Sequence, residues 1–254
     1  MSSDTTEFVP TGIPGMDEML EGRGIPRGYN IILAGGPGSG KTIFSIQFLS
    51  NGITMFDEPG VYVSVDESPI FIRDNMAKLG FDLVRLEERG EFAILDVSPI
   101  RYVKGKMVGE KVSTAFRVGK KDFSLLDFRR ELSSIMEEID ARRVVIDPIT
   151  ILMLQHADEA ERRYAMIDLM QALAITGSTS LIISELRGTA LEREHQFEEY
   201  LAQGVILQRT QVMRGELIKT IQVEKMRGLD HDNQPRPYRI TSSGIEVYPS
   251  QRVL

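Results

Sequence analysis

Residues 35–42 read Gly35-Gly36-Pro37-Gly38-Ser39-Gly40-Lys41-Thr42, which is a complete Walker A pattern. Glycines let the backbone turn tightly enough for successive N–H groups to point inward at phosphate oxygens, and a following helix adds the positive end of its dipole. In such a loop Lys41 can reach the β- and γ-phosphates, and the hydroxyl of Thr42 can bind Mg²⁺. The pattern therefore predicts a site for a nucleoside triphosphate and Mg²⁺.

The residues on either side of this pattern have the character that a phosphate loop requires. Residues 29–34 read as a mostly buried strand, and residues 43–49 read as a helix that we expect to end at Gly52. The alternative is a glycine-rich turn between a strand and a helix that binds no ligand. Average residue usage gives the bare pattern by chance in roughly one chain of this length in a hundred, and the flanking elements favour the nucleotide site further.

Composition limits the class of protein. The chain has 254 residues, of which 42% are hydrophobic, so we expect one domain over residues 1–254. It has no cysteine, which excludes disulfides and thiolate metal ligands. Its three histidines are well separated, which argues against a metal site built from histidines. Without a long apolar run or a signal sequence, we expect a cytoplasmic protein with no membrane partner. The net charge of −7 disfavours a surface devoted to nucleic acid, although a local basic patch can override it.

Two carboxylates, Asp66 and Glu67, directly follow a predicted strand at residues 61–65. Ligands of open parallel sheets collect at the carboxyl ends of strands, so this pair can hold an attacking water molecule. The alternative is that both acids only lie at the start of the helix that Ser68-Pro69 begins, where negative charge is mildly favourable. The neighbouring phosphate loop favours catalysis.

Asp147 ends another predicted strand, at residues 143–147, in the manner of a Walker B segment. An aspartate at this place can complete the metal shell that Thr42 begins. Further strands are expected at residues 92–96 and 181–185, and helices at 125–139 and 159–174. This alternation predicts an α/β fold with a mostly parallel sheet.

From residue 204 onward the pattern changes to strands without helices. Residues 205–209 and 217–224 read as a hairpin, and residues 238–240 and 245–248 as a last pair of strands. Lys225 and Arg227, on alternate residues before Gly228, point the same way and can reach one phosphate. The alternative for these two cations is a solvated strand end.

Two segments carry charge of opposite sign. Residues 101–121 contain seven basic residues and one acid, which indicates either a solvated loop or a docking site for an acidic partner or nucleic acid. Residues 185–200 contain five acids and two arginines, and such a loop would repel a phosphate backbone.

With these elements in this order, the chain resembles the KaiC-like branch of RecA-type ATPases over nearly its whole length. The stretches that look like family signatures are residues 44–52, 57–61, 141–144, Ile240-Thr241 and Gly244-Ile245. The resemblance implies a central twisted sheet with helices on both faces, one KaiC-type domain, and a homohexameric ring that binds ATP between subunits.

The resemblance also implies roles for particular residues. Asp66 and Glu67 match the acidic pair that activates water. Lys225 and Arg227 match the cations that are inserted into the γ-phosphate site of a neighbouring subunit, and His231 falls near that interface.

The chain departs from the family pattern in three respects. Its acidic pair is Asp-Glu where Glu-Glu is usual, which leaves open whether Asp66 or Glu67 is the base. The basic excursion at 101–121 is longer than expected. No Ser-Thr phosphorylation pair lies near the carboxyl end, so autokinase activity is not expected.

These observations lead us to expect a Mg²⁺-dependent ATPase ring that acts as a nucleotide-state switch on a protein partner. The alternative is a RecA/RadA-like recombinase paralogue that binds nucleic acid. A P-loop kinase for a small substrate would need an acceptor site or a lid, and the sequence shows neither.

Overall fold

The computed structural model describes residues 7–97, 115–117, 125–153, 156, 158–186, 195–213 and 215–253, with backbone only for 115–117 and Met213. Most of the basic segment at 101–121 therefore lies outside the described residues. Residues 187–194 of the acidic segment lie outside them too.

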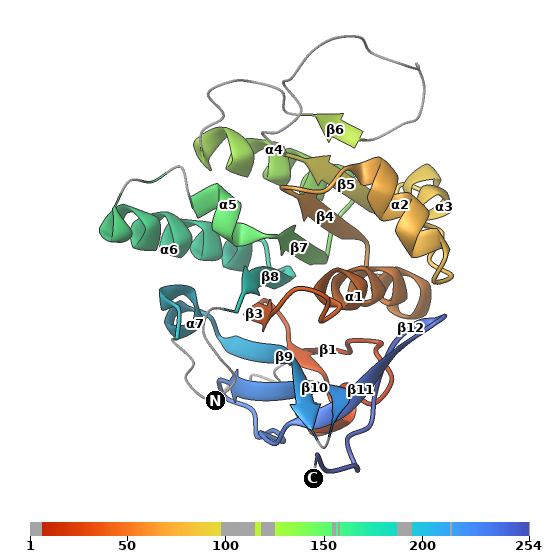
Figure 1. The fold of residues 1–254 in the computed structure, drawn as a ribbon. Helices are drawn as coiled ribbons and strands as arrows, with labels where there is room; N and C mark the ends of the chain where they lie inside the picture. Colours follow the sequence, from red (N-terminus) through yellow and green to blue (C-terminus); the bar gives the residue numbers. More distant parts are fainter. Residues whose placement is uncertain are drawn as a thin grey trace, which may run out of the picture.

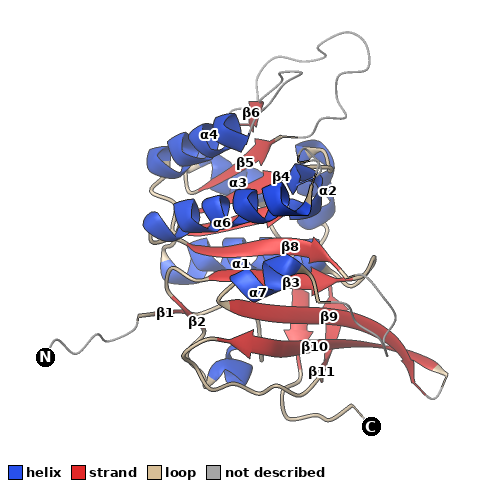
Figure 2. Cartoon of the chain, turned by 90° about the vertical axis from the view of Figure 1, so that its left-hand side faces the viewer, coloured by secondary structure: helices blue, strands red, loops and turns tan. Residues whose placement is uncertain are grey.

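A ten-stranded sheet runs through the molecule in the order β12-β11-β10-β9-β3-β8-β7-β4-β5-β6 (Figures 1 and 2). The strands are β3 (Asn30–Gly35), β4 (Gly60–Ser64), β5 (Phe92–Asp96), β6 (Ala115–Arg117), β7 (Arg143–Asp147), β8 (Thr179–Glu185), β9 (Gly204–Met213), β10 (Glu216–Met226), β11 (Arg236–Thr241) and β12 (Gly244–Val247). Strands from β9 to β6 in this order pair in parallel, whereas β9 to β12 pair antiparallel. This arrangement confirms the predicted α/β fold with a C-terminal β-region.

Helices cover both faces of the sheet, as Figure 1 shows for α1 on one side and α6 on the other. One face carries the 3₁₀-helix η1 (Asp17–Leu20), α1 (Lys41–Phe56), α2 (Pro69–Ala77) and α3 (Leu83–Glu88), and the other carries α4 (Leu125–Glu138), α5 (Ile149–Met153), α6 (Glu159–Ile175) and α7 (Phe197–Leu201). Successive side chains of a strand point to opposite faces, so Ile31 and Leu33 pack on the α1 side and Ile32 packs on the α6 side. The continuous apolar run of β3 is typical of a parallel strand buried on both faces.

The N-terminal stretch is mostly irregular, with η1 as its short helical turn. Its strands β1 (Phe8–Val9) and β2 (Ile25–Pro26) form a separate two-stranded sheet. Met16 and Leu20 are fully buried in the core on the α1 side. This stretch therefore closes one end of that core.

The expectation that the first helix ends at Gly52 is wrong. Helix α1 continues to Phe56, and Asp57 ends it with a left-handed backbone, φ 56°. A Cβ added to Gly52 would lie 2.5 Å from Nε of Arg143, so this glycine makes room for that side chain. Burial of a distant side chain thus explains a glycine in the middle of the helix.

The Arg143 side chain is fully buried beneath α1. Its Nε donates to Oε2 of Glu58 at 2.7 Å, its Nη1 donates to the Phe48 carbonyl at 2.9 Å, and its guanidinium lies 4.5 Å from the centroid of the Phe48 ring. Arg27 donates to the other oxygen of Glu58 at 2.5 Å. The buried arginine is thus paired and hydrogen-bonded, as a charge in a core must be.

We expect Gly52→Ala to lower the free energy of unfolding by about 1–3 kcal/mol, because the new methyl group overpacks the Arg143 site. An ordinary helix-interior glycine would give the opposite result, a gain of about 1 kcal/mol. Urea denaturation followed by circular dichroism measures the difference. Thr54→Ala, at an exposed position of the same helix, is the matched control and should change stability little. A Gly52→Ala protein as stable as wild type would contradict this explanation.

Candidate functional site

The phosphate loop connects β3 to the first turn of α1. Gly38 and Gly40 have φ of 71° and 90°, a region that residues with a Cβ rarely adopt. Nζ of Lys41 donates to the Gly36 carbonyl at 3.0 Å, and the Ser39 N–H donates to the same oxygen at 3.3 Å. The ammonium and this N–H therefore both point to the same carbonyl of the loop.

Thr42 and Asp147 meet beside this loop, as the sequence predicted. Oγ1 of Thr42 donates to Oδ2 of Asp147 at 3.2 Å, and the hydroxyl of Tyr62 donates to the same oxygen at 2.6 Å. Two neighbouring ligands of octahedral Mg²⁺, each at about 2.1 Å from the ion, lie about 3 Å apart. The hydroxyl and carboxylate oxygens thus have the type and spacing that Mg²⁺ requires.

Burial and nearby charges act on the ionisable groups of this edge. Burial lowers the pKa of Lys41, and the carboxylates of Asp147, Glu185 and Asp66 oppose that shift. Burial raises the pKa of Asp147, and Asp66 adds to the increase, whereas hydrogen bonds from Tyr62 and Thr42 counteract it. Several acids therefore share one cation, and this surplus of negative charge suits a divalent metal ion.

Asp66 and Glu67 lie in the turn after β4, at the same edge of the sheet. The Val65 N–H donates to the Asp147 carbonyl at 2.9 Å, and the Ser64 hydroxyl donates to the Glu67 carbonyl at 2.5 Å, so the turn is attached to β7. Burial is the largest cause that raises the pKa of both acids. Such a shift brings a carboxylate closer to the pKa of an effective general base.

The two acids differ in their surroundings. Asp66 is exposed, and its pKa is raised further by Glu185. Glu67 is half-buried, and its pKa is raised further by Asp147 and Asp66, against a hydrogen bond with Asn75. The geometry brings both carboxylates to the phosphate-loop edge.

Glu185, the last residue of the strand predicted at 181–185, is a third acid at this edge. Its Cα lies opposite that of Gly35 in the parallel pair of β8 and β3. Its charge acts on both Lys41 and Asp66. The polar end of the predicted strand was the signal that could have found it.

Three other residues near the loop carried no sequence signal. Tyr62 holds Asp147, as described above. Nζ of Lys219, on β10, donates to the Gly38 carbonyl, and the hydroxyl of Tyr238, on β11, donates to the Ser39 carbonyl. These contacts depend on which strands are neighbours, and no local pattern encodes that.

Lys225 and Arg227 lie at the other end of the strands, away from the phosphate loop. The Arg227 N–H donates to the Gln203 carbonyl at 2.9 Å, and the Gln203 N–H donates to the Asn30 carbonyl at 3.0 Å, at the start of β3. The five residues from there to Gly35 span about 17 Å at about 3.3 Å per residue. The structure therefore does not bring these cations to the phosphate loop of the same chain.

The two cations nevertheless converge on one acceptor. Nζ of Lys225 and Nη2 of Arg227 both donate to the Tyr200 carbonyl, at 3.3 and 3.1 Å. That both can reach one phosphate stays a prediction. His231 lies in the connection after β10, where its Nδ1 is 3.1 Å from the Leu229 carbonyl.

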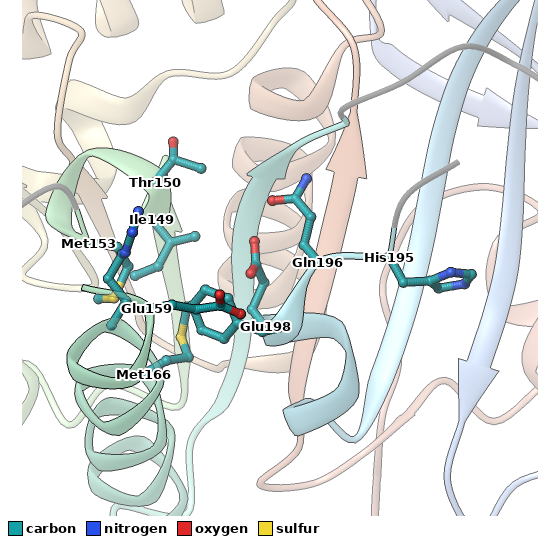
Figure 3. Close-up of a pocket in the computed structure, with 10 residues that line it drawn as sticks. Ile149, Thr150, Met153, Glu159, Met166, His195, Gln196 and Glu198 are labelled. Atoms are coloured by element: carbon teal, nitrogen blue, oxygen red, sulfur yellow. The ribbon is translucent and has the colours of Figure 1, made fainter. Parts of the chain in front are cut away.

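A cavity of about 380 Å³ lies between α5, α6 and the start of α7 (Figure 3). Its lining includes Thr150, Glu159, Gln196 and Glu198, and no residue of the phosphate loop. In Figure 3 the His195 ring points away from the other lining side chains. The cavity thus adjoins Glu185, whose carbonyl accepts a hydrogen bond from Gln196 at 2.5 Å, but the phosphate loop does not line it.

Two acids of the acidic segment at 185–200 are buried. Glu198 and Glu199 are only 3% and 4% exposed, and Glu198 accepts a hydrogen bond from the Ser184 hydroxyl at 2.8 Å. These two acids do not present their charge to a phosphate backbone. The expectation that the whole segment repels nucleic acid is therefore wrong for this pair.

A second group of ligand-type side chains lies beside α7 and β10. One atom each of His195, Glu199 and Glu224 lies within 4.8 Å of the others. The Lys225 ammonium donates to the Glu199 carbonyl at 2.9 Å, which places a cation next to the group. That cation disfavours a divalent ion there.

No helix within the described part of the chain is long and apolar enough to cross a bilayer.

Gln208 is an anomaly beneath the phosphate loop. This β9 residue is fully buried, its Cα lies opposite that of Gly35, and within the described residues neither polar atom of its amide has a hydrogen-bond partner. An unpartnered buried polar group costs about 1–3 kcal/mol. Gln208 therefore has hydrogen-bonding groups next to the loop that no described residue satisfies.

Comparison with known proteins gives a consistent result. A family profile described as "ATPase: KaiC" matches residues 9–252. The UPF0273 protein PH0284 of Pyrococcus horikoshii is 37% identical over 246 residues, which cover 97% of this chain and 96% of that protein. A UPF0273 protein of Thermotoga maritima is 37% identical over 243 residues, which cover 96% of each chain.

Two further similarities involve KaiC itself and a solved structure. The circadian clock oscillator protein KaiC of Synechococcus elongatus is 34% identical over 241 residues, which cover 94% of this chain but 44% of KaiC. The crystal structure of the KaiC-like protein PH0186 from Pyrococcus horikoshii superposes with a TM-score of 0.80 at 32% identity, covering 96% of this chain and 100% of that one.

We expect Gln208→Met to raise the free energy of unfolding by about 1 kcal/mol, because it removes an unpartnered amide and keeps the volume of the side chain. Gln203→Met is the matched control. Oε1 of Gln203 accepts the Asn30 N–H at 3.0 Å, so this substitution should lower stability instead. Urea denaturation of the two variants measures the difference, and equal losses would show that the Gln208 amide is hydrogen-bonded in solution.

Proposed function

Because the chain belongs to the family of KaiC ATPases, we propose that residues 1–254 form a single domain that binds Mg²⁺ and ATP at residues 35–42 and hydrolyses the ATP. The observation that carries this proposal is the convergence of Lys41, Thr42 and Asp147 at one edge of the sheet. A glycine loop with two positive-φ residues, a cation and a pair of oxygen ligands is the set that a nucleoside triphosphate requires.

Each part of the loop has a distinct task in this proposal. The N–H groups of the loop and the ammonium of Lys41 bind the phosphate oxygens. Thr42 and Asp147 would hold Mg²⁺, which neutralises charge on the phosphates when bound. The hydrogen bond from Tyr62 keeps the Asp147 carboxylate oriented toward Thr42.

The acidic pair supplies the base that accepts a proton from the attacking water. We assign this role to Glu67, which is half-buried. Burial raises its pKa, and the charges of two neighbouring carboxylates raise that pKa further. Asp66 is more exposed, and water screens its interactions more strongly. The negative charge of Asp66 then assists by raising the pKa of Glu67, which makes Glu67 a stronger base.

We expect Glu67→Gln to keep ATP bound and to slow hydrolysis by about 10²- to 10⁴-fold, the usual contribution of a general base. Asp66→Asn should slow hydrolysis less. Lys41→Ala is the matched control, which should lose nucleotide affinity rather than turnover alone. Phosphate release and calorimetric ATP binding separate these effects.

Three outcomes would count against this assignment. If only Asp66→Asn traps ATP, then Asp66 is the base. If neither acid variant slows phosphate release, the acidic pair has no catalytic role and only lies at the start of α2. A Lys41→Ala protein with unchanged ATPase activity would contradict the assignment of the nucleotide site itself.

The location of Lys225 and Arg227 supports a site shared between subunits. The Arg227 backbone lies about 17 Å along β3 from the loop of its own chain, by the strand rise given above. The Lys225 ammonium donates to the Ala202 carbonyl at the same end of the sheet, and both cations converge on the Tyr200 carbonyl. Such a pair can serve a phosphate only if the phosphate belongs to a neighbouring copy. A repeated contact between unlike faces closes into a ring, and we propose the hexamer that the family resemblance implied, with His231 at the same interface.

We expect Arg227→Ala to abolish most turnover and to leave ATP affinity largely intact, because an arginine that meets charge developing on the transferred phosphoryl group is worth about 10³ to 10⁵ in rate. Arg239→Ala, on the exposed side of β11, is the matched control and should hydrolyse normally. Steady-state phosphate release at fixed protein concentration measures both.

Mixing provides the sharper form of this experiment. Arg227→Ala and Glu67→Gln chains, each nearly inactive, should regain activity when mixed, because some interfaces then pair an intact Glu67 with an intact Arg227. Failure of the mixture under conditions where the chains exchange would contradict a shared site. Constant activity per chain on dilution to demonstrated monomers would contradict it as well.

The proposed ring binds a protein partner, and the nucleotide state of the ring controls that binding. The acidic chain, with a net charge of −7, supports a protein partner over a nucleic acid. Glu198 and Glu199 are buried, so two of the acids that counted against nucleic-acid binding no longer do so, and a recombinase-like paralogue stays the alternative. The basic segment at 101–121 is our candidate for contact with an acidic partner.

A further inference from the structure

The C-terminal strands contact the phosphate loop from outside through two hydrogen-bond donors. Nζ of Lys219 donates to the carbonyl of Gly38, and the hydroxyl of Tyr238 donates to the carbonyl of Ser39. These two carbonyls belong to successive peptide units. The contacts therefore act on the part of the loop in which N–H groups would meet phosphate oxygens.

The planarity of the peptide unit makes these contacts consequential. In a trans peptide the C=O and N–H of one unit point in opposite directions. The Gly38 carbonyl shares its unit with the Ser39 N–H, and the Ser39 carbonyl shares its unit with the Gly40 N–H. Holding both carbonyls toward β10 and β11 turns both N–H groups to the other side.

On this other side a loop N–H lies close to the Lys41 ammonium. The Ser39 N–H points across the loop at the Gly36 carbonyl, at 3.3 Å, and the Lys41 ammonium donates to the same oxygen. A phosphate bound between them would find the N–H groups already oriented. Donors that are oriented in advance bind without the cost of reorganisation.

The loop needs such an external restraint because its own sequence provides little. Gly38 and Gly40 flank Ser39, and glycine has the least hindered backbone of all residues. A peptide unit beside a glycine can rotate at low cost. A hydrogen bond to its carbonyl selects one orientation.

Tyr238 is held firmly enough to provide that restraint. It is 3% exposed, and burial raises the pKa of its hydroxyl, which therefore remains a neutral donor. The same strand packs on the loop through Ile240, whose Cδ1 lies 2.9 Å from the position of a Cβ on Gly40. Lys219 is only half-buried, so Tyr238 is the more strongly fixed of the two.

We propose that Tyr238 and Lys219 are positioning residues for polyphosphate binding, which orient the peptide units 38–39 and 39–40 so that their N–H groups face the phosphates. This inference rests on the proposed nucleotide site and adds the C-terminal strands to it. Neither side chain touches the substrate. Each acts through a backbone carbonyl.

The test uses Tyr238→Phe, which removes one hydroxyl and keeps the ring, in the full-length protein. Tyr248→Phe is the matched control, because that hydroxyl donates to Oε2 of Glu246 away from the loop. Calorimetric titration in Mg²⁺ measures the affinity for ATP and ADP, and competition measures that for inorganic tripolyphosphate. Thermal unfolding without nucleotide records any effect on the fold.

We expect Tyr238→Phe to weaken all three ligands by about 3- to 10-fold, the usual effect of one hydrogen bond, while Tyr248→Phe changes none of them. The equal loss for tripolyphosphate identifies the phosphate as the affected group, because that ligand has no base or ribose. Lys219→Met, combined with Tyr238→Phe, should weaken the three ligands further. Lys219→Arg in place of Lys219→Met should recover that additional loss.

Other outcomes overturn the inference. A Tyr238→Phe protein that melts at a lower temperature but binds ATP and ADP normally would show that the hydrogen bond only stabilises the fold. Loss of ATP affinity with unchanged tripolyphosphate affinity would place the effect on the nucleoside. A wild-type protein that binds none of the ligands would remove the proposed function as well, whereas the first two outcomes leave it intact.

Discussion

The parallel register of β3, β8, β7 and β4 is the constraint on which the site depends. Backbone hydrogen bonds place Gly35 opposite Glu185 and Ser64 opposite Asp147, so the ends of the four strands meet at one edge without any long loop having to fold over them. A slip of one residue would turn every side chain of a strand to the other face. The carboxylate of Asp147 would then leave Thr42 and Tyr62, and the apolar residues between them would leave their cores. Stability of the sheet and geometry of the site are therefore one requirement.

Sequence patterns predicted those parts of the site that are encoded locally. The glycine loop, the acids after β4 and the acid that ends β7 each lie beside an apolar run whose end can be recognised, and parallel pairing then brings them together. The contacts of Tyr62, Lys219 and Tyr238 could not be predicted, because they depend on which distant strands become neighbours. The role of Gly52 was mistaken for the same reason: its local pattern is that of a helix end, and only the burial of Arg143 explains why the helix continues.

Two buried polar groups show how differently the fold treats charge and polarity. The Arg143 guanidinium is surrounded by an acid, a carbonyl and an aromatic ring, so its removal from water is compensated. Breaking such a pair by removing one partner typically costs about 3–5 kcal/mol. The Gln208 amide has no such compensation within the described residues, and it lies directly beneath the first glycine of the loop. The Gln208 amide thus lies next to a candidate site, where natural proteins commonly accept a loss of stability.

Strand β10 has a property that becomes important in an assembly. Through Lys219 it contacts the phosphate loop of its own chain, and six residues later, about 20 Å along the strand, it carries Lys225 at the other end of the strands. In a ring built as proposed, one stiff strand would span the distance from one nucleotide to the next. A displacement of the loop in one subunit would then be coupled mechanically to the neighbouring nucleotide site. Because coupling between binding sites is reciprocal, nucleotide bound at either site would affect the other through the same strand.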